Sequence, residues 1–462
     1  MKKTFLFYDL ETSGLRKAFD QVLQYAALRV DENLEIVEEI EYKVRLNPDT
    51  IPSPEAIATH GIGVDDFNDQ MHESMAMCHI HQIHNQPGTI SGGYNTLGFD
   101  DEFLRFSFYR NLLNPYTHQF SNGCGRFDIY PMMPFYYLYA KDAIKWPMIN
   151  GKVSLKLDNI NQENNWLKGR AHDAMHDVRV TLKLAQEMRD FDREKWAYAM
   201  GYFDKATDLD RIVQLPSVKT FGADVLKGGL LISGLFAKDR FVKPALYLGA
   251  HHHFKNQGLW LILDEPLSEG SNWHKLIMKK KLAEAPFVLP LGERFDSLLS
   301  EEQIDNMESN FKWIDRNLLF LQSMARQQKD RTLPPLDDCD PDARIYQDGF
   351  RTRDDYQWAD EFYQSMITHK LDMIDSAPSD IMATQAARII YRNYPNNVNA
   401  AVRKVAKMDQ KGCDHLGQYP LSVKEAITRT SKVLETDLSP ETRHKVAELM
   451  SFLKEREHGK TD

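Results

Sequence analysis

Cysteine is scarce in this chain, and none of it is arranged in a motif. The 462 residues include four cysteines, Cys78, Cys124, Cys339 and Cys413, and they form no Cys-x-x-Cys pair. This spacing excludes a disulfide framework and a zinc ribbon. Scattered, unpaired thiols are typical of a reducing compartment, so we expect a cytoplasmic protein.

Long apolar runs are missing as well. The apolar run that starts at Thr4 stops at Asp9, which is too short for the hydrophobic core of a signal peptide. No stretch approaches the ~20 apolar residues that a membrane span needs. The sequence therefore predicts no membrane partner, and it also contains no internal repeat and no low-complexity tract.

An excess of positive charge is the third feature that the sequence lacks. The chain carries 57 lysines and arginines against 67 aspartates and glutamates, which gives a formal net charge of -10. That balance argues against a generally basic nucleic-acid coat protein, but it leaves room for a local basic groove on an acidic body. Hydrophobic residues make up 42% and charged residues 27%, which is typical of a globular protein with a sizeable core.

The N-terminal part alternates between strand-like and helix-like segments. The predicted strands are residues 4–8, 21–30, 36–46 and 89–94, and the predicted helices are 52–58, 101–112 and 173–188. A turn at residues 31–33 joins the second and third strands, which predicts an antiparallel pair. Alternating strands and helices with this antiparallel start predict an α/β domain with a mixed sheet.

The rest of the chain divides into two further parts, in agreement with a length of about three domains. Strand-like segments at 230–236 and 259–263, with a turn predicted at Gly228–Gly229, indicate a small β-rich second domain. The proline-rich stretch 331–344 predicts a linker. Helical periodicity in 356–374, 380–394, 421–434 and 440–455 predicts a helical third domain. The predicted domains are 1–195, 196–340 and 341–462.

Two acidic residues close the first predicted strand. Asp9 and Glu11 stand two residues apart, and alternate residues of a strand share a face, so both carboxylates point the same way. Adjacent carboxylates repel each other unless a cation neutralises them, and oxygen ligands of this kind suit Mg²⁺ or Mn²⁺. An isolated Asp-x-Glu is more often only an acidic strand end, so the interpretation depends on the other motifs.

A second acidic site follows the strand at 89–94. The segment that continues from this strand, residues 93–102, ends in Asp100, Asp101 and Glu102. An aspartate at this place makes an ordinary helix N-cap, and we expect Asp101 to do that or to favour the helix dipole. Asp100, next to the apolar Phe99, is the better candidate for a carboxylate that faces inward.

The third site combines a histidine with an aspartate five residues later. On one continuous helix His172 and Asp177 would be ~140° apart and would not converge. They converge if His172 lies in the loop before the helix, Asp173 is the N-cap and Asp177 lies in the first turn. The buried stripe of this helix is predicted at Ala174, Val178, Thr181, Leu182, Ala185 and Met188.

Four carboxylates from three separated segments, with one histidine, describe a two-metal site for phosphoryl transfer. Two divalent ions ~3.5–4 Å apart stabilise the attacking and leaving oxygens of an in-line displacement. An imidazole, with an ordinary pKa of about 6.5, can deprotonate the attacking water at neutral pH.

These motifs together resemble the DEDDh exonuclease superfamily, whose fold is ribonuclease H-like. The residues that carry the resemblance are Phe7–Thr12, Tyr94–Asn95, Phe99–Asp100 and the pair His172 and Asp177, with Thr59–Ile62 as a fitting segment between the first two motifs. Within the superfamily the chain is most similar to the bacterial exodeoxyribonuclease I family, through local stretches such as Phe108–Asn111, Lys145–Pro147, Ala171–Met175, Ile232–Phe236 and Tyr391–Pro395. The resemblance implies an exonuclease domain, a β-barrel domain resembling SH3 and a helical C-terminal domain.

The resemblance also implies an activity and a set of site residues. The activity is 3′→5′ degradation of single-stranded DNA to 5′-mononucleotides in DNA repair or recombination. It uses two Mg²⁺ ions, for which Mn²⁺ can substitute. The metal ligands are Asp9, Glu11, Asp100 and Asp177; His172 is the general base, and Glu11 also approaches the 3′ end.

The implied strand contacts are Arg105, Tyr116, Phe120 and Lys156, since aromatic rings stack on bases and cations neutralise phosphates. Lys156 and Phe120 depart from the family, where we expect Arg and Trp. Single-stranded DNA-binding protein is the implied partner, and we expect a monomer.

Two other functions remain open on the sequence alone. The first is a 3′→5′ exoribonuclease or oligonucleotide nuclease, because no residue reveals how a 2′-hydroxyl would be selected. The second is a catalytically silent DNA-binding or assembly protein. The presence of all four predicted metal ligands and of His172 argues against it. Three further features are given ordinary roles: Cys78, His81 and His84 as a polar helix face, His251–His253 as a strand end or loop, and Lys279–Lys281 as a solvated run.

Overall fold

The computed structural model describes residues 3–66, 68–169, 172–221, 224–332, 334–408 and 410–459. Ala171, which belongs to the third motif, lies outside these ranges. The chain divides into two units. The first combines Met1–Arg126, Leu167–Leu182 and Pro335–Asp462, and the second combines Phe127–Trp166 and Lys183–Pro334. The predicted boundaries of three domains stay a prediction.

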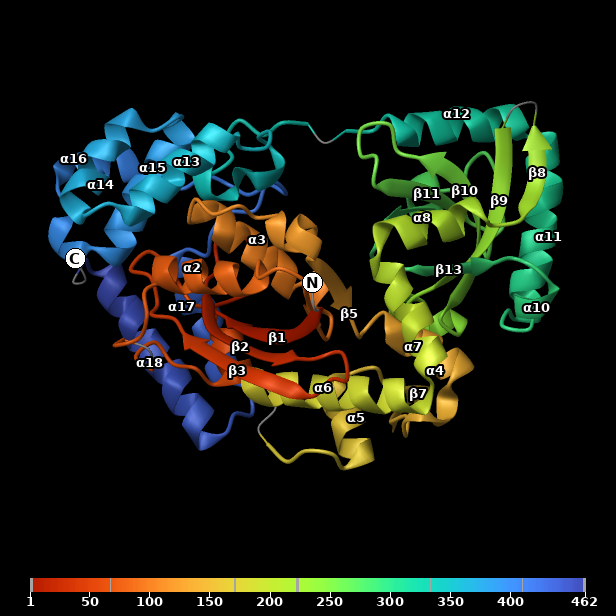
Figure 1. The fold of residues 1–462 in the computed structure, drawn as a ribbon, viewed down its shortest axis with the longest axis horizontal. Helices are drawn as coiled ribbons and strands as arrows, with labels where there is room; N and C mark the ends of the chain where they lie inside the picture. The colour runs from red at the N-terminus through yellow and green to blue at the C-terminus, as the bar shows by residue number, and fades with distance from the viewer. Residues whose placement is uncertain are drawn as a thin grey trace. The chain divides into compact units, whose positions relative to one another are not determined.

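A mixed five-stranded sheet lies at the centre of the N-terminal part (Figure 1). Its strands, in the order β3-β2-β1-β4-β5, are Ile36–Lys43, Val22–Val30, Thr4–Thr12, Thr89–Gly93 and Gly125–Asp128. The sequence predicts the mixed sheet and four of its strands, but not β5. Strand β1 pairs antiparallel with β2 and parallel with β4. The strand that carries Asp9 and Glu11 is therefore hydrogen-bonded on both edges.

The two faces of β1 have different chemistry. Leu6, Tyr8 and Leu10 belong to the apolar core that the sheet forms with helices α2 (Glu73–His84) and α3 (Asp100–Arg110). Since side chains alternate along a strand, Asp9 and Glu11 point to the opposite face. Helix α6 (Ala174–Phe191) lies on that side in Figure 1, and its six predicted stripe residues are all buried. The alternation separates the acidic site from the core.

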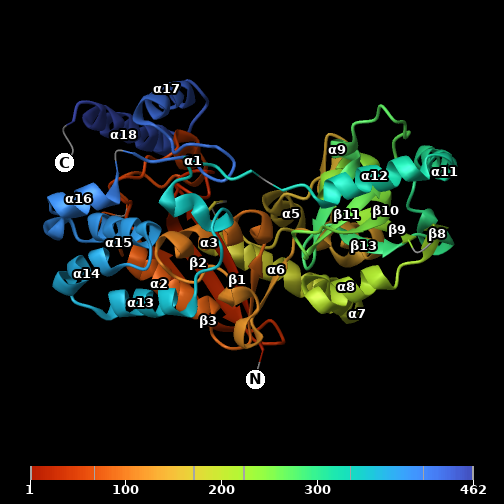
Figure 2. The same cartoon turned by 90° about the horizontal axis from the view of Figure 1, so that it is seen from above.

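The C-terminal part of the chain is helical, as predicted, and belongs to the first unit. Its helices are α13 (Arg353–Gln364), α14 (Ile367–Met373), α15 (Asp380–Asn393), α16 (Ala400–Ala406), α17 (Val423–Leu434) and α18 (Pro440–Glu457). Helix α16 lay outside the predicted segments. Helices α17 and α18 pack on α1 (Pro54–His60) through an apolar cluster that includes Ile57, Ala426 and Leu449, and Figure 2 shows the three helices together. Residues more than 350 positions apart therefore form one wall of the same unit.

The second unit contains the predicted β-rich part, an antiparallel six-stranded sheet. Its strands are β8 (Ser217–Phe221), β9 (Asp224–Ile232), β10 (Val242–Ala250), β11 (Gln257–Ile262), β12 (Ile277–Lys281) and β13 (Phe287–Pro290). Its helices are α4 (Met132–Tyr139), α5 (Leu157–Asn164), α7 (Arg193–Met200), α8 (Lys205–Val213), α9 (Trp273–Leu276), α10 (Glu293–Asp296), α11 (Glu301–Arg316) and α12 (Leu318–Lys329), and β6 (Met148–Ile149) pairs with β7 (Lys152–Val153).

Two local predictions in this unit were wrong. Gly228 and Gly229 do not form a turn, because both pair with β10 inside strand β9. A Cβ at Gly229 would stand 3.0 Å from Trp260, so the glycine serves close packing. Lys280 is not solvated, because strand alternation turns it inward to a buried ion pair with Asp208 at 2.5 Å.

Two further sequence expectations concern membranes and loops. None of the helices within the described ranges combines the length and the apolar character that crossing a membrane requires. The prediction for His251–His253 is confirmed, because β10 ends at Ala250 and the three histidines form the loop before β11.

Candidate metal centre and catalytic site

Strand β1 delivers the first two carboxylates. Glu11 lies near the end of the strand and is buried, and Asp9 is partly buried. The chain just beyond Glu11 is fixed on both sides. The Nε2 atom of His60 lies 3.1 Å from the carbonyl oxygen of Thr12, and the N–H of Ser53 donates to the carbonyl of Ser13 at 2.7 Å. Helix α1 and its N-terminal turn thus hold the chain at the end of β1.

The second motif reaches the site because β4 approaches β1 very closely. A Cβ at Gly93 would lie 2.4 Å from the carbonyl oxygen of Tyr8, so only glycine fits there. The chain then turns through Asn95, which has a left-handed φ of 63°. Asp100 follows as the first residue of α3 and is buried at 4% exposure. This turn places Asp100 next to the strand of Asp9.

The third motif has the geometry that the sequence predicts. His172 lies before α6, with a left-handed φ of 60°. Asp173 accepts the N–H of His176 at 3.1 Å, which confirms it as the N-terminal cap of the helix. The N–H of His172 donates to Asp177 Oδ2 at 3.2 Å, so the loop folds back onto the first turn. This fold-back overcomes the angular separation that one continuous helix would impose.

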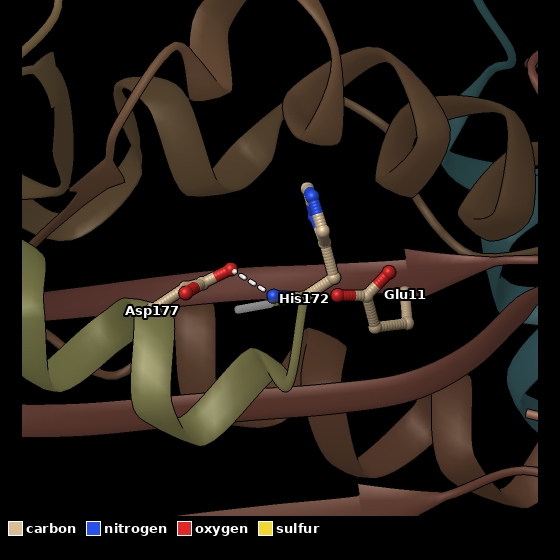
Figure 3. A group of neighbouring side chains, drawn as sticks. All are labelled: Glu11, His172 and Asp177. Atoms are coloured by element: carbon tan, nitrogen blue, oxygen red, sulfur yellow. Dashed lines mark hydrogen bonds between the residues drawn. The ribbon is translucent and has the colours of Figure 1, made fainter. Parts of the chain in front are cut away.

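Residues from two of the three motifs meet at one point. Glu11, His172 and Asp177 each offer one ligand atom, and these atoms lie within 4.8 Å of one another (Figure 3). Figure 3 shows the carboxylates of Glu11 and Asp177 on either side of the His172 backbone, with the imidazole ring standing above them. Oxygen and nitrogen donors at such distances can share one divalent cation.

A single cavity unites all the predicted catalytic residues. It has a volume of about 470 Å³ and is lined by side chains that include Asp9, Glu11, Asp100, His172 and Asp177. Cys78, His81 and His84 join no such site. His84 Nε2 lies 3.0 Å from the hydroxyl of Tyr25, and His81 Nε2 lies 2.9 Å from the Asn114 carbonyl. Across the described ranges, Glu11, His172 and Asp177 are the one group of this kind with converging ligand atoms.

The electrostatics of this cavity favour a bound cation. Burial raises the pKa of Asp9 well above its ordinary value, and the charges of Asp100 and Glu11 raise it further. Asp177 adds to the same effect. Carboxylates that resist ionisation together are stabilised by a divalent cation, which neutralises the repulsion. The donor set therefore fits a hard metal ion.

Asp101 does not cap helix α3, so the predicted cap was wrong, although Asp101 does lie in the first turn, where a negative charge favours the helix dipole. Residue 99 holds the cap position, and Asp101 is buried with Arg105 at 2.8 Å and Arg126 at 2.6 Å. His118 Nε2 lies 3.1 Å from its other oxygen. Burial alone would raise the pKa of Asp101, but the two guanidinium groups hold it well below its usual range. Asp101 is thus a structural anion behind Asp100, because its charge is neutralised from within the protein.

The four predicted strand contacts occupy different environments. Arg105 is buried and ion-paired with Asp101 and Glu102, and its guanidinium lies 5.9 Å from the ring of Tyr116. Phe120 is 64% exposed, which leaves its ring accessible to a base. Lys156 is exposed at the start of α5, in the second unit. Their roles toward DNA stay predictions.

Several residues of the cavity were not found from the sequence. Arg16 and Asp20 come from the loop after β1, and Leu421 and Arg429 come from the C-terminal helical part. A cation close behind Asp-x-Glu could have been noticed in the sequence. The sequence around Leu421 and Arg429 contains no motif that indicates a site, because only the packing of α17 and α18 on α1 brings these residues to the cavity.

Comparison with known proteins agrees with this site. The family model described as "Exonuclease" matches residues 6–185, which include every predicted metal ligand and His172. The N-terminal part of the chain is therefore similar to the exonuclease family. Two relatives named exodeoxyribonuclease I are 31% identical over 198 residues, from Haemophilus influenzae, and 30% identical over 221 residues, from Escherichia coli. The matches cover 42% and 47% of this chain and span less than half of each relative, 42% and 46%.

Solved structures extend the likeness to almost the whole chain. An exonuclease I structure with bound product is similar with a TM-score of 0.79 and 22% identity, over 98% of this chain and 100% of that one. The exonuclease I of Methylocaldum szegediense has a TM-score of 0.80 and 21% identity, over 98% and 99%. At this identity the likeness establishes the fold. The resemblance to exodeoxyribonuclease I that the sequence predicts is confirmed, and so is the predicted fold class.

Proposed function

We propose that this protein is a 3′→5′ exodeoxyribonuclease that degrades single-stranded DNA to 5′-mononucleotides, in DNA repair or recombination. The observation that carries the proposal is the single cavity that gathers Asp9, Glu11, Asp100, His172 and Asp177 from three distant segments. The matched relatives bear the name exodeoxyribonuclease I, and one similar structure is a complex of Escherichia coli exonuclease I with a dA16 oligonucleotide.

The residues of the cavity have separate tasks in this proposal. Asp9, Glu11, Asp100 and Asp177 would hold two Mg²⁺ ions, with Mn²⁺ as a substitute, since carboxylate oxygens suit both. Bound ions would supply Lewis-acid chemistry, polarising the scissile phosphate and stabilising charge on the attacking and leaving oxygens. Glu11 also borders the 3′ terminal nucleotide, as its place at the end of β1 allows.

His172 is the proposed general base. An imidazole nitrogen takes a proton from the attacking water as the new bond from oxygen to phosphorus forms. The bond between phosphorus and the 3′ oxygen of the preceding nucleotide breaks, and that oxygen gains a proton from solvent. The products are a 5′-mononucleotide and a strand that is shorter by one nucleotide. The fold-back of His172 onto Asp177 fixes the backbone of the base relative to a metal ligand.

The remaining proposals concern the strand and the cellular setting. Phe120 and Tyr116 would stack on bases, and Arg105 and Lys156 would face phosphates. Single-stranded DNA-binding protein is the proposed partner, which the resemblance supports. The protein is also proposed to be a monomer and to be cytoplasmic, and its scattered cysteines support the cytoplasmic location. Light scattering and co-purification with single-stranded DNA-binding protein test the monomeric state and the partner directly.

Digestion of end-labelled oligonucleotides tests the activity. With Mg²⁺, a single-stranded DNA labelled at its 5′ end should shorten progressively, while a 3′ label should be released at once as a mononucleotide. A product series that starts from the 5′ end would overturn the polarity. A matched RNA that is cleaved faster would replace the proposal with an exoribonuclease, and tight binding without Mg²⁺-dependent turnover would indicate a silent DNA-binding protein.

A further inference from the structure

The loop between strands β1 and β2 brings a cation to the catalytic cavity. Arg16 lines the cavity together with Asp9 and Glu11, seven and five positions earlier in the chain. Its backbone is locked, because its N–H donates to Asp20 Oδ2 at 2.7 Å and its carbonyl accepts the N–H of Asp20 at 2.7 Å. Arg16 is therefore held in place on the wall of the site.

The guanidinium of Arg16 is only partly satisfied within the protein. Its Nη2 lies 3.1 Å from Glu425 Oε1, in an ion pair whose side chains are 24% and 45% exposed. Its Nη1 is buried and has no hydrogen-bond partner among the residues that the structure describes. A buried N–H of a charged group without a partner is unfavourable, so an acceptor from a ligand would be stabilised there.

A second arginine on the same wall shows the contrast. Arg429 also lines the cavity, but Glu55 neutralises it through two hydrogen bonds of 3.0 and 2.7 Å. The guanidinium of Arg16 makes one hydrogen bond, to the exposed Glu425. A ligand anion can replace Glu425 there, because exposed ion pairs are weak. Of these two arginines, Arg16 is therefore the one whose guanidinium can still donate a hydrogen bond to a ligand.

We propose that Arg16 binds a backbone phosphate of the nucleic acid strand next to the scissile linkage, as a substrate-positioning residue. The planar guanidinium matches two oxygens of a phosphate, which is why arginine serves such sites. The ligand enters a cavity whose other charges are largely carboxylates, so a cation on its wall lowers the cost of bringing a polyanion to the metal ligands. This inference rests on the proposed function, because it takes a nucleic acid strand as the substrate.

Two opposite substitutions separate this role from a structural one. Arg16→Gln removes the phosphate contact and the ion pair, whereas Glu425→Gln releases Arg16 and removes the ion pair, together with a longer contact of 3.4 Å to Arg429, which keeps both hydrogen bonds to Glu55. In binding to single-stranded DNA in EDTA, we expect Arg16→Gln to raise Kd about ten- to a hundredfold and to lower the slope of log K against log salt by about 0.7. Glu425→Gln should leave Kd unchanged or lower it. If Glu425→Gln weakens binding as much as Arg16→Gln does, the ion pair is what matters and the inference is wrong.

The contacted phosphate can be located with neutral linkages. Single methylphosphonates are introduced one at a time at the linkages nearest the 3′ end. One position should weaken binding to the wild type and have no further effect on Arg16→Gln. Equal losses at every position in both proteins would overturn the inference.

The result also remains decisive if Arg16→Gln folds poorly. Arg16→Lys keeps the charge but loses the planar fork, so it should weaken binding severalfold and keep the salt slope; unchanged binding would contradict the proposal. Degradation of DNA by the wild type tests the proposed function separately. If the wild type degrades DNA and neither Arg16 variant changes binding, only this inference fails.

Discussion

The repulsion between Glu11 and Asp177 gives a quantitative test of the metal centre. Their converging carboxylate oxygens lie within 4.8 Å, and two unit charges at that distance repel by about 3.5 kcal/mol at an effective dielectric constant of ~20. Because Asp177 is only partly buried, solvent screens part of this energy, and we expect about 1–2 kcal/mol to remain. Replacing Asp177 by Asn should therefore stabilise the metal-free protein while it removes a metal ligand.

Thermal unfolding measures both effects. In EDTA, the melting temperature of Asp177→Asn should exceed that of the wild type by about 2–8 °C, since a domain of this size shifts by roughly 2–4 °C per kcal/mol. Added Mg²⁺ should raise the melting temperature of the wild type by mass action and that of the variant much less. Degradation of single-stranded DNA by the variant should be lost.

A matched control distinguishes the effect of losing any carboxylate charge from the effect of losing a carboxylate at the metal site. Glu187 lies on the same helix and pairs with Lys183 at 2.5 Å on the surface. Glu187→Gln should respond to Mg²⁺ as the wild type does. The reasoning would be refuted if Asp177→Asn melted at or below the wild-type temperature in EDTA, or if Mg²⁺ stabilised both proteins equally.

Three further predictions address other parts of the structure. Replacing His172 by Ala should lower kcat about 10²- to 10⁴-fold without changing the Kd for DNA in EDTA, and an equal loss in Kd would argue against a general base. Burial raises the pKa of Asp20 from 3.8 to about 6, so the folded state binds the Asp20 proton more tightly than the unfolded state does. The contribution of this proton to folding stability is complete below pH 4 and is lost as the pH rises through 6. Asp20→Asn should therefore gain up to about 3 kcal/mol over the wild type above pH 6 and nothing below pH 4, as unfolding in denaturant at several pH values would reveal. Asp208→Asn leaves the buried Lys280 without its anionic partner and should destabilise the second unit by about 3–5 kcal/mol, whereas the double variant Asp208→Leu, Lys280→Met should recover most of that loss in a melting experiment.

The sequence by itself determined the strands and helices that carry the chemistry. Alternation along β1 predicted that Asp9 and Glu11 share a face, and the helical period of α6 predicted its buried stripe, because both patterns follow from local backbone geometry. The cap at Asp173 was likewise readable, since a cap depends on a few adjacent residues. The resemblance to a known family rests on these same local motifs.

Tertiary structure decided which charges are free to act and which are neutralised. Asp101 and Lys280 look like surface residues in the sequence, yet Arg126 and Asp208 reach them from other segments and neutralise them in the interior. Arg16 became a candidate for phosphate binding because Glu425, 409 positions later, satisfies one of its nitrogens, and Nη1 has no partner among the described residues. A local pattern fixes the direction of a side chain, but the ionic partners of that side chain depend on packing between segments that are far apart in the chain.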